Sequence, residues 1–279
     1  MFRAYRRPVA TGDAVPVIGP RRIVCLTEEP TEVLYALGAD ARIVGISGFT
    51  VRPAIARRQK PKVSAFTRAK IGEILELRPD FVVGFSDIQA DIAAELIKAG
   101  VEVWISNHRS VEGILQYVQR LGALVGEPQK ALAYADTLRA HLDTVAKKAA
   151  LLPARPKVYF EEWDEPLISG IQWVAELIRI AGGDDILPDL AQEPLAKQRI
   201  MADGGRVIAA NPDIIFGSWC GKKFRPGKVA ERPGWQAITA VRQQQMYEIK
   251  SPIILQPGPA ALTDGLDAMA AHIAAWARP

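Results

Sequence analysis

Aromatic side chains recur at one kind of place in this chain, the point where a short apolar run ends. Flat apolar side chains with a few polar groups beside them suit a large, rigid, partly aromatic ligand. Core packing explains any single aromatic equally well, so the inference depends on their shared position. We predict a ligand-binding site at these strand ends and in the loops that follow. Its predicted members are Phe49, Phe66, Phe85, Ser86, Asp87, Asn107, Trp163, Trp173, Trp219 and Gln256.

Signatures of catalysis are few. The sequence contains no GxxxxGK(S/T), GxGxxG, HExxH or GxSxG motif. An acidic cluster of Glu161, Glu162, Asp164 and Glu165 follows a predicted strand and could hold a metal or supply a general base. One alternative is therefore an enzyme with its active site between two lobes, such as a glycosyltransferase. Because no glycine loop that could cradle a phosphate is present, we predict that the protein is not an enzyme.

The histidines and cysteines are isolated from one another. His141 and His272 fall within predicted helices, where surface or packing roles are commoner. His108 follows a strand end in "ISNHRS", a better place for a ligand, although a bond to the backbone is the commoner role. Cys25 and Cys220 form no CxxC pair and no disulfide framework. They could act as soft metal ligands, but buried cysteines are commoner. We predict no metal site and no intrinsic cofactor.

One small unit occurs twice. "RPDFVVGFSD" begins at Arg78 and "NPDIIFGSWC" begins at Asn211, and both place a proline, an aspartate, an apolar run and a glycine in the same order. The residue before a proline disfavours the helical region, so a helix ends there and a buried strand begins. Ligands of open α/β sheets bind beyond the carboxyl ends of the strands. Two facing lobes would therefore place both strand ends across one cleft.

Short apolar runs alternate with helical stretches on either side of one long helix. Near-continuous apolar strands of this kind indicate parallel sheets covered on both faces. From Pro128, "PQKALAYADTLRAHLDTVAKKAALLP" has apolar residues at steps of three and four, with no glycine and no internal proline. A packing helix inside a single domain is the alternative. We predict an α/β fold of two Rossmann-like lobes with parallel sheets, joined by this long rigid helix. The predicted parts are a flexible arm (1–20), a first lobe (21–126), the linking helix (127–154) and a second lobe with a closing helix (155–279).

Composition and charge exclude some classes of protein. The 279 residues are 49% hydrophobic and 24% charged, as in a globular protein with a sizeable core. The net charge of +4 comes from scattered basic residues, whereas nucleic-acid binding needs them gathered on one face. No apolar run approaches the roughly 18 residues of a membrane span. The first 20 residues lack the apolar core of a signal peptide. We therefore expect a cytoplasmic monomer without nucleic-acid binding or membrane insertion, or a periplasmic protein if the native start is missing.

From Arg21 onward the chain resembles the periplasmic substrate-binding proteins for vitamin B12 and iron chelates. The order and spacing of several segments carry the likeness, and it is closest to the cobalamin-binding branch. The resemblance implies a class III substrate-binding fold in which an aromatic-lined cleft grips a corrinoid or an iron chelate with little hinge closure. The segments include "RRIVCLTEEPTEVLYALGADARIVGIS", "IGEILELRPDFVVGFSD", "YFEEWDEPLISGIQWVAELIRIAGGDDI" and "VIAANPDIIFGSW".

The chain departs from that family at the positions where its members dock on an ABC permease. Members usually carry a glutamate on each lobe, in the helix before the proline–aspartate turn, and these carboxylates dock on permease arginines. The matching positions here are Gly72 and Gly205, with Glu73 one residue beyond the first. The departure makes docking through paired carboxylates doubtful for this chain.

These features together predict non-catalytic binding of a corrinoid, such as cobalamin, or of a similar large metal chelate. The missing signal peptide and docking glutamates favour a cytoplasmic carrier or sensor. The alternative is the substrate-binding component of an ABC importer for vitamin B12, haem or a ferric siderophore. An enzyme is less favoured. A protein-interaction module that has lost its ligand is a further class, and bulky residues filling the cleft would support it.

Overall fold

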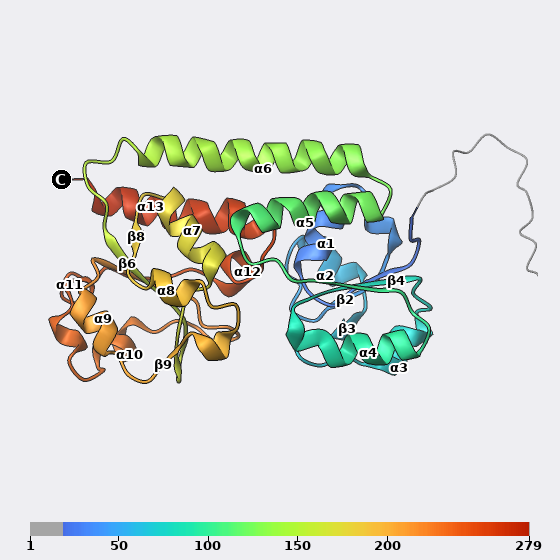
Figure 1. The fold of residues 1–279 in the computed structure, drawn as a ribbon, viewed down its shortest axis with the longest axis horizontal. Coiled ribbons are helices and arrows are strands. Elements are labelled where there is room, and N and C mark those ends of the chain that lie inside the picture. Colours follow the sequence, from blue (N-terminus) through green and yellow to red (C-terminus); the bar gives the residue numbers. More distant parts are fainter. Residues whose placement is uncertain (1–18, 279) are drawn as a thin grey trace, which may run out of the picture.

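The computed structural model describes residues 19–278, which form two α/β lobes bridged along one side by a long helix (Figure 1). The predicted arm over residues 1–20 lies almost wholly outside the described residues. Each lobe has its own sheet, which confirms the predicted fold class. The lobe boundaries given above remain our proposal. No helix between residues 19 and 278 is both long and apolar enough to cross a membrane.

The first lobe contains a parallel sheet of five strands in the order β3-β2-β1-β4-β5. Because all five run in one direction, their carboxyl ends share one edge of the sheet. The strands are β1 (Ile23–Cys25), β2 (Ile43–Ser47), β3 (Lys62–Ser64), β4 (Phe81–Phe85) and β5 (Val103–Ser106). The helices are α1 (Glu29–Ala36), α2 (Ala54–Gln59), α3 (Ile71–Glu76), α4 (Ala90–Lys98) and α5 (Val111–Leu124).

The second lobe contains a mixed sheet in the order β11-β10-β6-β7-β9, with β8 also paired to β6. Strand β7 runs antiparallel to both β6 and β9, which differs from the prediction of a parallel sheet. The cause is the short connection from β6 to β7, because two residues can join only antiparallel neighbours. The strands are β6 (Lys157–Asp164), β7 (Leu167–Ser169), β8 (Asp184–Asp185), β9 (Ile200–Met201), β10 (Ile214–Gly217) and β11 (Met246–Glu248).

The helices of the second lobe lie on both faces of its sheet. On the face towards the long helix lie α7 (Gln172–Ile180), α12 (Ser251–Ile254) and α13 (Leu266–Trp276), with a π-helical turn at Ala261–Gly265 before α13. On the other face lie α8 (Pro188–Ala191), α9 (Gly205–Ala210), α10 (Pro226–Ala230) and α11 (Thr239–Arg242).

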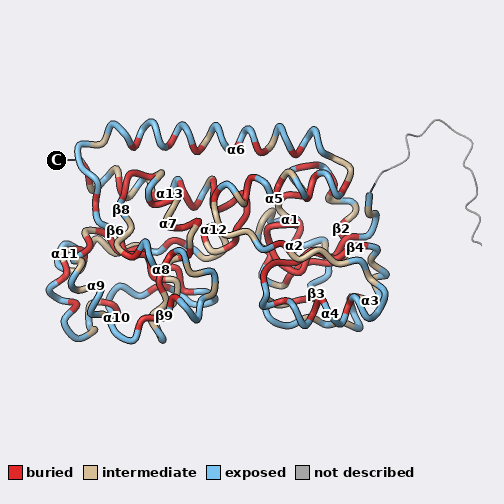
Figure 2. Tube along the Cα trace, viewed as in Figure 1, coloured by how far each residue is buried: buried red, intermediate tan, exposed pale blue. Residues whose placement is uncertain are grey.

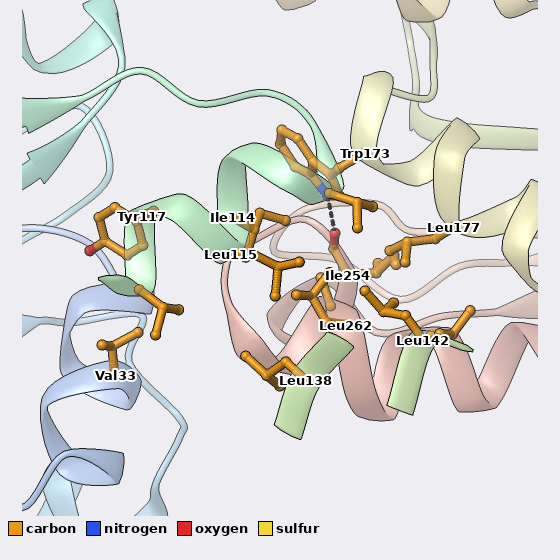
Figure 3. Packing of buried hydrophobic residues seen from close by; sticks show 14 of the residues in the cluster. Val33, Ile114, Leu115, Tyr117, Leu138, Leu142, Trp173, Leu177, Ile254 and Leu262 are labelled. Atoms are coloured by element: carbon orange, nitrogen blue, oxygen red, sulfur yellow. Dashed lines mark hydrogen bonds between the residues drawn. The ribbon is translucent and has the colours of Figure 1, made fainter. Parts of the chain in front are cut away.

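One hydrophobic core runs through both lobes along the long helix α6 (Pro128–Ala149). The buried face of α6 has the predicted spacing of three and four residues, while its opposite face is exposed (Figure 2). Its buried residues are Ala131, Ala135, Leu138, Leu142, Val145 and Ala149. Side chains from α5, α7 and α12 meet this stripe between the lobes (Figure 3). Sheets and helices of both lobes therefore share one apolar interior.

Successive side chains of the central strands point to opposite faces, so each sheet packs against two hydrophobic cores. Phe81 and Val83 of β4 face the shared core, while Val82 between them faces a smaller core under α3 and α4. In β10, Phe216 faces the shared core, and Ile215 faces the core under α8 to α11. Successive side chains of a strand point to opposite faces, so a sheet covered on both sides needs continuous apolar runs.

The repeated proline–aspartate unit fixes the start of the first strand in each lobe. Both residues before the proline have positive φ, 48° at Arg78 and 49° at Asn211, and end the preceding helix. The Asp80 carboxylate accepts the backbone N–H of Arg22 at 2.8 Å, just before β1. The Asp213 carboxylate accepts the N–H of Lys157 at 2.8 Å, at the start of β6. The repeat therefore anchors equivalent strands.

The repeated glycine is required by close packing in both copies. A Cβ atom at Gly84 would clash with the side chains of Gln89 and Ile105. A Cβ atom at Gly217 would fall on the ring of Phe224. By contrast, a Cβ atom at Gly72 meets no atom of residues 19–278 within 4 Å. The first two glycines are therefore steric requirements, and the third is not.

We predict that Gly84→Ala and Gly217→Ala each lower the free energy of unfolding by about 1–3 kcal/mol, because an added methyl group overpacks a full interior. Gly72→Ala is the matched control, and it should be neutral or stabilising because alanine favours a helix. Urea denaturation of the three variants measures these differences. Equal stability of all three would contradict the packing described here.

Candidate ligand-binding cleft

A cavity of about 290 Å³ lies between the lobes, where loops that follow strands of both sheets meet. This is just below the range for small-ligand pockets, roughly 300–1,000 Å³. A large chelate would therefore protrude from it. The first lobe contributes Phe66, Phe85, Ser86, Asp87, Ile88 and Arg109. The second contributes Glu162, Ile171, Trp173, Pro194, Leu195, Ala196, Lys197, Arg199 and Leu255.

Half of the predicted site residues line this cavity, namely Phe66, Phe85, Ser86, Asp87 and Trp173. They come from both lobes, as the two-lobe cleft requires. The Trp173 indole N–H donates to the Ile254 carbonyl at 2.8 Å, so its polar group is satisfied inside the protein (Figure 3). The rest of the ring is left as an apolar wall. Ligand contact by these five residues stays a prediction.

The other predicted residues do not line the cavity. Phe49 is 48% exposed on the loop after β2, and Asn107 is exposed after β5. Trp163 donates to the Glu165 carbonyl at 2.8 Å, and the Lys222 ammonium lies 4.1 Å from the centroid of its ring.

Trp219 and Gln256 also lie outside the cavity lining. Trp219 is buried in the core under α8 to α11, where its indole N–H donates to Glu161 at 3.0 Å. Gln256 follows the lining residue Leu255 and is 8% exposed. Its side-chain oxygen has no hydrogen-bond partner among residues 19–278. A position after a strand thus does not by itself bring a residue to the cavity.

The acidic cluster after the first strand of the second lobe is occupied by ion pairs. Glu161 is fully buried and accepts two hydrogen bonds from Arg232, at 2.6 and 2.9 Å. Glu162 pairs with Arg199 at 2.6 Å, and Asp164 pairs with Lys222. In the described chain no group of three or more His, Cys, Asp or Glu side chains could hold a metal. These carboxylates therefore act as partners of basic side chains.

Gln89 fixes the aromatic wall of the first lobe. It is fully buried in the 3₁₀ turn Asp87–Gln89 after β4. Its side-chain oxygen accepts the Phe85 N–H at 2.9 Å, and its amide donates to the Phe66 carbonyl at 3.1 Å. Ser86, which lies between Phe85 and the 3₁₀ turn, has a backbone φ of 70°, and this value is unusual for a residue other than glycine. Backbone strain of this kind concentrates at functional sites. The loops after β3 and β4 are thus held in one arrangement.

Two arginines in the cavity wall were not predicted. Arg109 lies over the Phe85 ring at 4.6 Å and donates to the Ser86 hydroxyl at 2.8 Å. Arg199 is 2% exposed and donates to Glu162 and to the Ser169 carbonyl. Arg109 belongs to the "ISNHRS" loop, which the sequence does mark. Arg199 precedes the two-residue strand β9, and so short a strand gives no periodicity.

His108 joins the first lobe to the loop after α12. Its Nε2 lies 2.7 Å from the Pro257 carbonyl, which can only accept, so Nε2 carries the proton. Its Nδ1 then accepts from the Ser106 hydroxyl at 2.8 Å. Burial lowers the pKa of His108 to about 4, so the ring is neutral at pH 7. This histidine is a structural contact to the backbone.

A family model described as periplasmic binding protein matches residues 23–253. The chain belongs to the periplasmic binding protein family. This confirms the resemblance seen in the sequence and the expectation of a binding protein that is not an enzyme.

Individual relatives of this periplasmic binding protein have low sequence identity to it but match most of its length. The vitamin B12-binding protein of Vibrio vulnificus strain YJ016 is 24% identical over 86% of each chain. An uncharacterized ABC transporter substrate-binding lipoprotein of Bacillus subtilis strain 168 is 23% identical over 91% of this chain and 80% of its own length. The structure of the periplasmic haem-binding protein RhuT from Roseiflexus sp. RS-1 has a TM-score of 0.79 at 23% identity. That match covers 93% of this chain and all of the other.

These comparisons contradict the expected cytoplasmic location. The matching family is that of periplasmic binding proteins, the Bacillus subtilis relative is a lipoprotein, and the similar solved structure is that of a periplasmic protein. The expectation came from the composition of the first 20 residues, which does not determine where the protein functions. The cytoplasmic carrier or sensor is therefore abandoned.

Three glutamates at the start of α1 lie where the first lobe of this binding protein meets the C-terminal segment. Glu28 is 8% exposed and Glu29 1% exposed. Burial raises the pKa of Glu28 to about 8 and that of Glu29 to about 7, and their neighbouring acids add to both shifts. Glu32 pairs with Arg52 at 3.1 Å and accepts the Ala260 N–H at 3.2 Å.

The raised pKa of Glu29 gives a pH-dependent prediction. Between its ordinary pKa of 4.5 and about 7, the folded protein keeps a proton that the unfolded chain releases. Its contribution to stability therefore falls as pH rises through this window. Glu29→Gln removes the titration, so the stability of the variant relative to the parent should increase from pH 5 to pH 8.

Urea unfolding at both pH values measures the change, with Glu95→Gln on the exposed face of α4 as the control. The trend, rather than the absolute difference, is the readout, because the new amide adds a constant cost. A parallel pH dependence in the parent and Glu29→Gln would contradict the raised pKa.

Proposed function

We propose that this chain is the substrate-binding component of an ABC importer and binds a corrinoid, haem or comparable iron chelate without changing it chemically. The observation that carries the proposal is the cavity between the lobes, walled by Phe66, Phe85 and Trp173. The names of the relatives, which include vitamin B12-binding, haem-binding and ABC transporter substrate-binding proteins, support this ligand class and this role.

The cavity suits a rigid, flat ligand for physical reasons. Aromatic rings from opposite lobes offer apolar area to both faces or edges of such a ligand. Because Gln89 holds the backbone at both Phe66 and Phe85, little backbone freedom of these loops is lost when a ligand binds. The core shared along α6 limits relative movement of the lobes. We therefore propose binding to a preformed cleft, with Ser86 and Asp87 as polar contacts.

Titration of the purified protein with cyanocobalamin, dicyanocobinamide, haem and a ferric siderophore tests this proposal. We expect one of these chelates to bind with one-to-one stoichiometry and to be recovered unchanged. Absorbance and calorimetry measure binding, and chromatography of the released ligand checks for turnover. The absence of binding by all four chelates would contradict the proposal.

Two phenylalanines provide a matched test of where the ligand lies. Phe66 lines the cavity and Phe49 does not. Phe66→Ala should weaken binding by about 1–3 kcal/mol, comparable to the burial of a large apolar side chain. Phe49→Ala should leave the affinity unchanged. Equal effects of the two substitutions would place the ligand outside the cavity.

We further propose that docking on a permease does not use paired glutamates at the usual helix starts. Gly72 and Gly205 are both exposed in the first turns of α3 and α9. In the described part of the chain, a Cβ atom at Gly72 meets open space, and one at Gly205 meets the Asp203 carboxylate alone. Side chains can therefore be added at both positions without displacing the core.

This arrangement predicts that the chain, exported by a signal peptide, does not restore vitamin B12 uptake in a strain lacking its own binding protein. Charge-assisted contacts to permease arginines would be missing. The double variant Gly72→Glu/Gly205→Glu should recover some uptake if the chain binds cobalamin, while Gly72→Gln/Gly205→Gln should not. Full uptake by the unaltered chain would contradict the prediction.

A further inference from the structure

Basic side chains from both lobes line the cavity. Arg109 comes from the first lobe, and Lys197 and Arg199 come from the second. The carboxylates of the lining are Asp87 and Glu162. The lining therefore has an excess of positive charge. A cavity built only for neutral apolar surface would not need three cations.

The charge of Arg199 is already compensated. Its guanidinium donates to Glu162 at 2.6 Å and to the Ser169 carbonyl. Its Nε is buried and has no partner in the described part of the chain. Arg199 is therefore held mainly by the protein, and Glu162 is not free to pair with Arg109.

Arg109 is different, because no carboxylate among residues 19–278 forms a hydrogen bond with it. The nearest, Asp87, lies 3.9 Å away and its side chain is 54% exposed. The Asp87 carboxylate instead accepts a hydrogen bond from Ser86 at 2.6 Å. The guanidinium donates to neutral groups, which are the Ser86 hydroxyl and the carbonyls of His108 and Pro194. A side-chain exposure of only 10% leaves this cation poorly hydrated.

The guanidinium is also held in a fixed orientation. It lies 4.6 Å from the centroid of the Phe85 ring, beside the strained Ser86. Its bond to the Pro194 carbonyl, 3.2 Å long, joins it to the second lobe across the cleft. A planar fork of this kind matches a carboxylate better than an amide. The Arg109 guanidinium is therefore pre-oriented to bind a carboxylate at the edge of the aromatic wall.

We propose that Arg109 is a specificity-determining residue, which binds an anionic group, such as a carboxylate, on the rim of a flat apolar chelate. This inference rests on the proposed function and names the ligand class of the same cleft. It assigns a preference for anionic chelates over corrinoids whose rims carry neutral amides. An incoming carboxylate takes the hydrogen bond that Arg109 now gives to Pro194, and Lys197 adds to the attraction.

Haem and haem dimethyl ester provide the test, because they share the flat metal-bearing ring and differ in their two carboxylates. We expect the parent protein to bind haem at least about tenfold more tightly than the ester, as for loss of a charge-assisted hydrogen bond. Arg109→Gln should abolish this preference, because it should weaken the binding of haem and not that of the ester. Arg109→Lys should keep part of it, because the charge remains and the fork is lost. Arg58→Gln, on the exposed face of α2, is the control and should keep the full ratio.

A second substitution tests the sign of the effect. Asp87→Asn removes the negative charge nearest to Arg109 and should raise the ratio of haem affinity to ester affinity several-fold. Equal affinity of the parent for haem and ester overturns the inference and leaves the proposed function standing. The inference is also overturned if Arg109→Gln keeps the full preference for haem over the ester. It is likewise overturned if the parent binds dicyanocobinamide tightly and does not bind haem. In both cases the proposed function stands. Failure of haem, ester, corrinoid and ferric siderophore to bind overturns the proposed function itself.

Discussion

The burial of one apolar stripe on α6 is the interaction on which the rest of the structure depends. Helix α5 of the first lobe and helices α7 and α13 of the second lobe all pack against α6, and the buried side chains of both lobes form one cluster with Ala135, Leu138 and Leu142. Separating the lobes would expose this shared interior at roughly 25 cal/mol for each Å² of apolar surface. Each lobe therefore has its own sheet, but the two lobes share one hydrophobic core.

Polar contacts reinforce the same junction on the side nearer the cleft. His108 of the first lobe bonds to the Pro257 carbonyl, and Glu32 accepts the Ala260 N–H. Arg52 reaches both Glu32 and Asp264. These contacts join α1 and the loops after β2 and β5 of the first lobe to the segment between α12 and α13 of the second lobe. The cavity lies between lobes that are held together by this junction and by the shared core.

Much of the fold could be predicted because it depends on local patterns. The spacing of apolar residues after Pro128 is enough to define α6, and the repeated proline–aspartate unit marks the same strand start in both lobes. The antiparallel strand β7 and its partner β9 could not be predicted, since they have only three and two residues and β7 depends on the hairpin with β6.

The candidate site was predictable only in part, because strand ends are local but the cavity depends on how two lobes meet. Phe66, Phe85 and Trp173 reach it. Trp219 occupies an equivalent position after β10, yet the buried Glu161 holds its indole in the core. Arg109 and Arg199 belong to loops whose meeting is set by tertiary structure. The aromatic character of the cleft could therefore be predicted from the sequence, whereas its positive charge could not.

The distance between the lobes with and without ligand tests the central claim, a preformed cleft held by a shared core. Spin labels at Ile97 of α4 and Ile200 of β9, which are 59% and 42% exposed, would report it across the opening. Both positions would be changed to cysteine, and the exposed Cys220 to serine. We predict that saturating haem shifts the mean distance by less than about 2 Å, as for a pre-organised complex. A larger shift, or a broad distribution that narrows on binding, would show that the lobes move independently and would contradict this account.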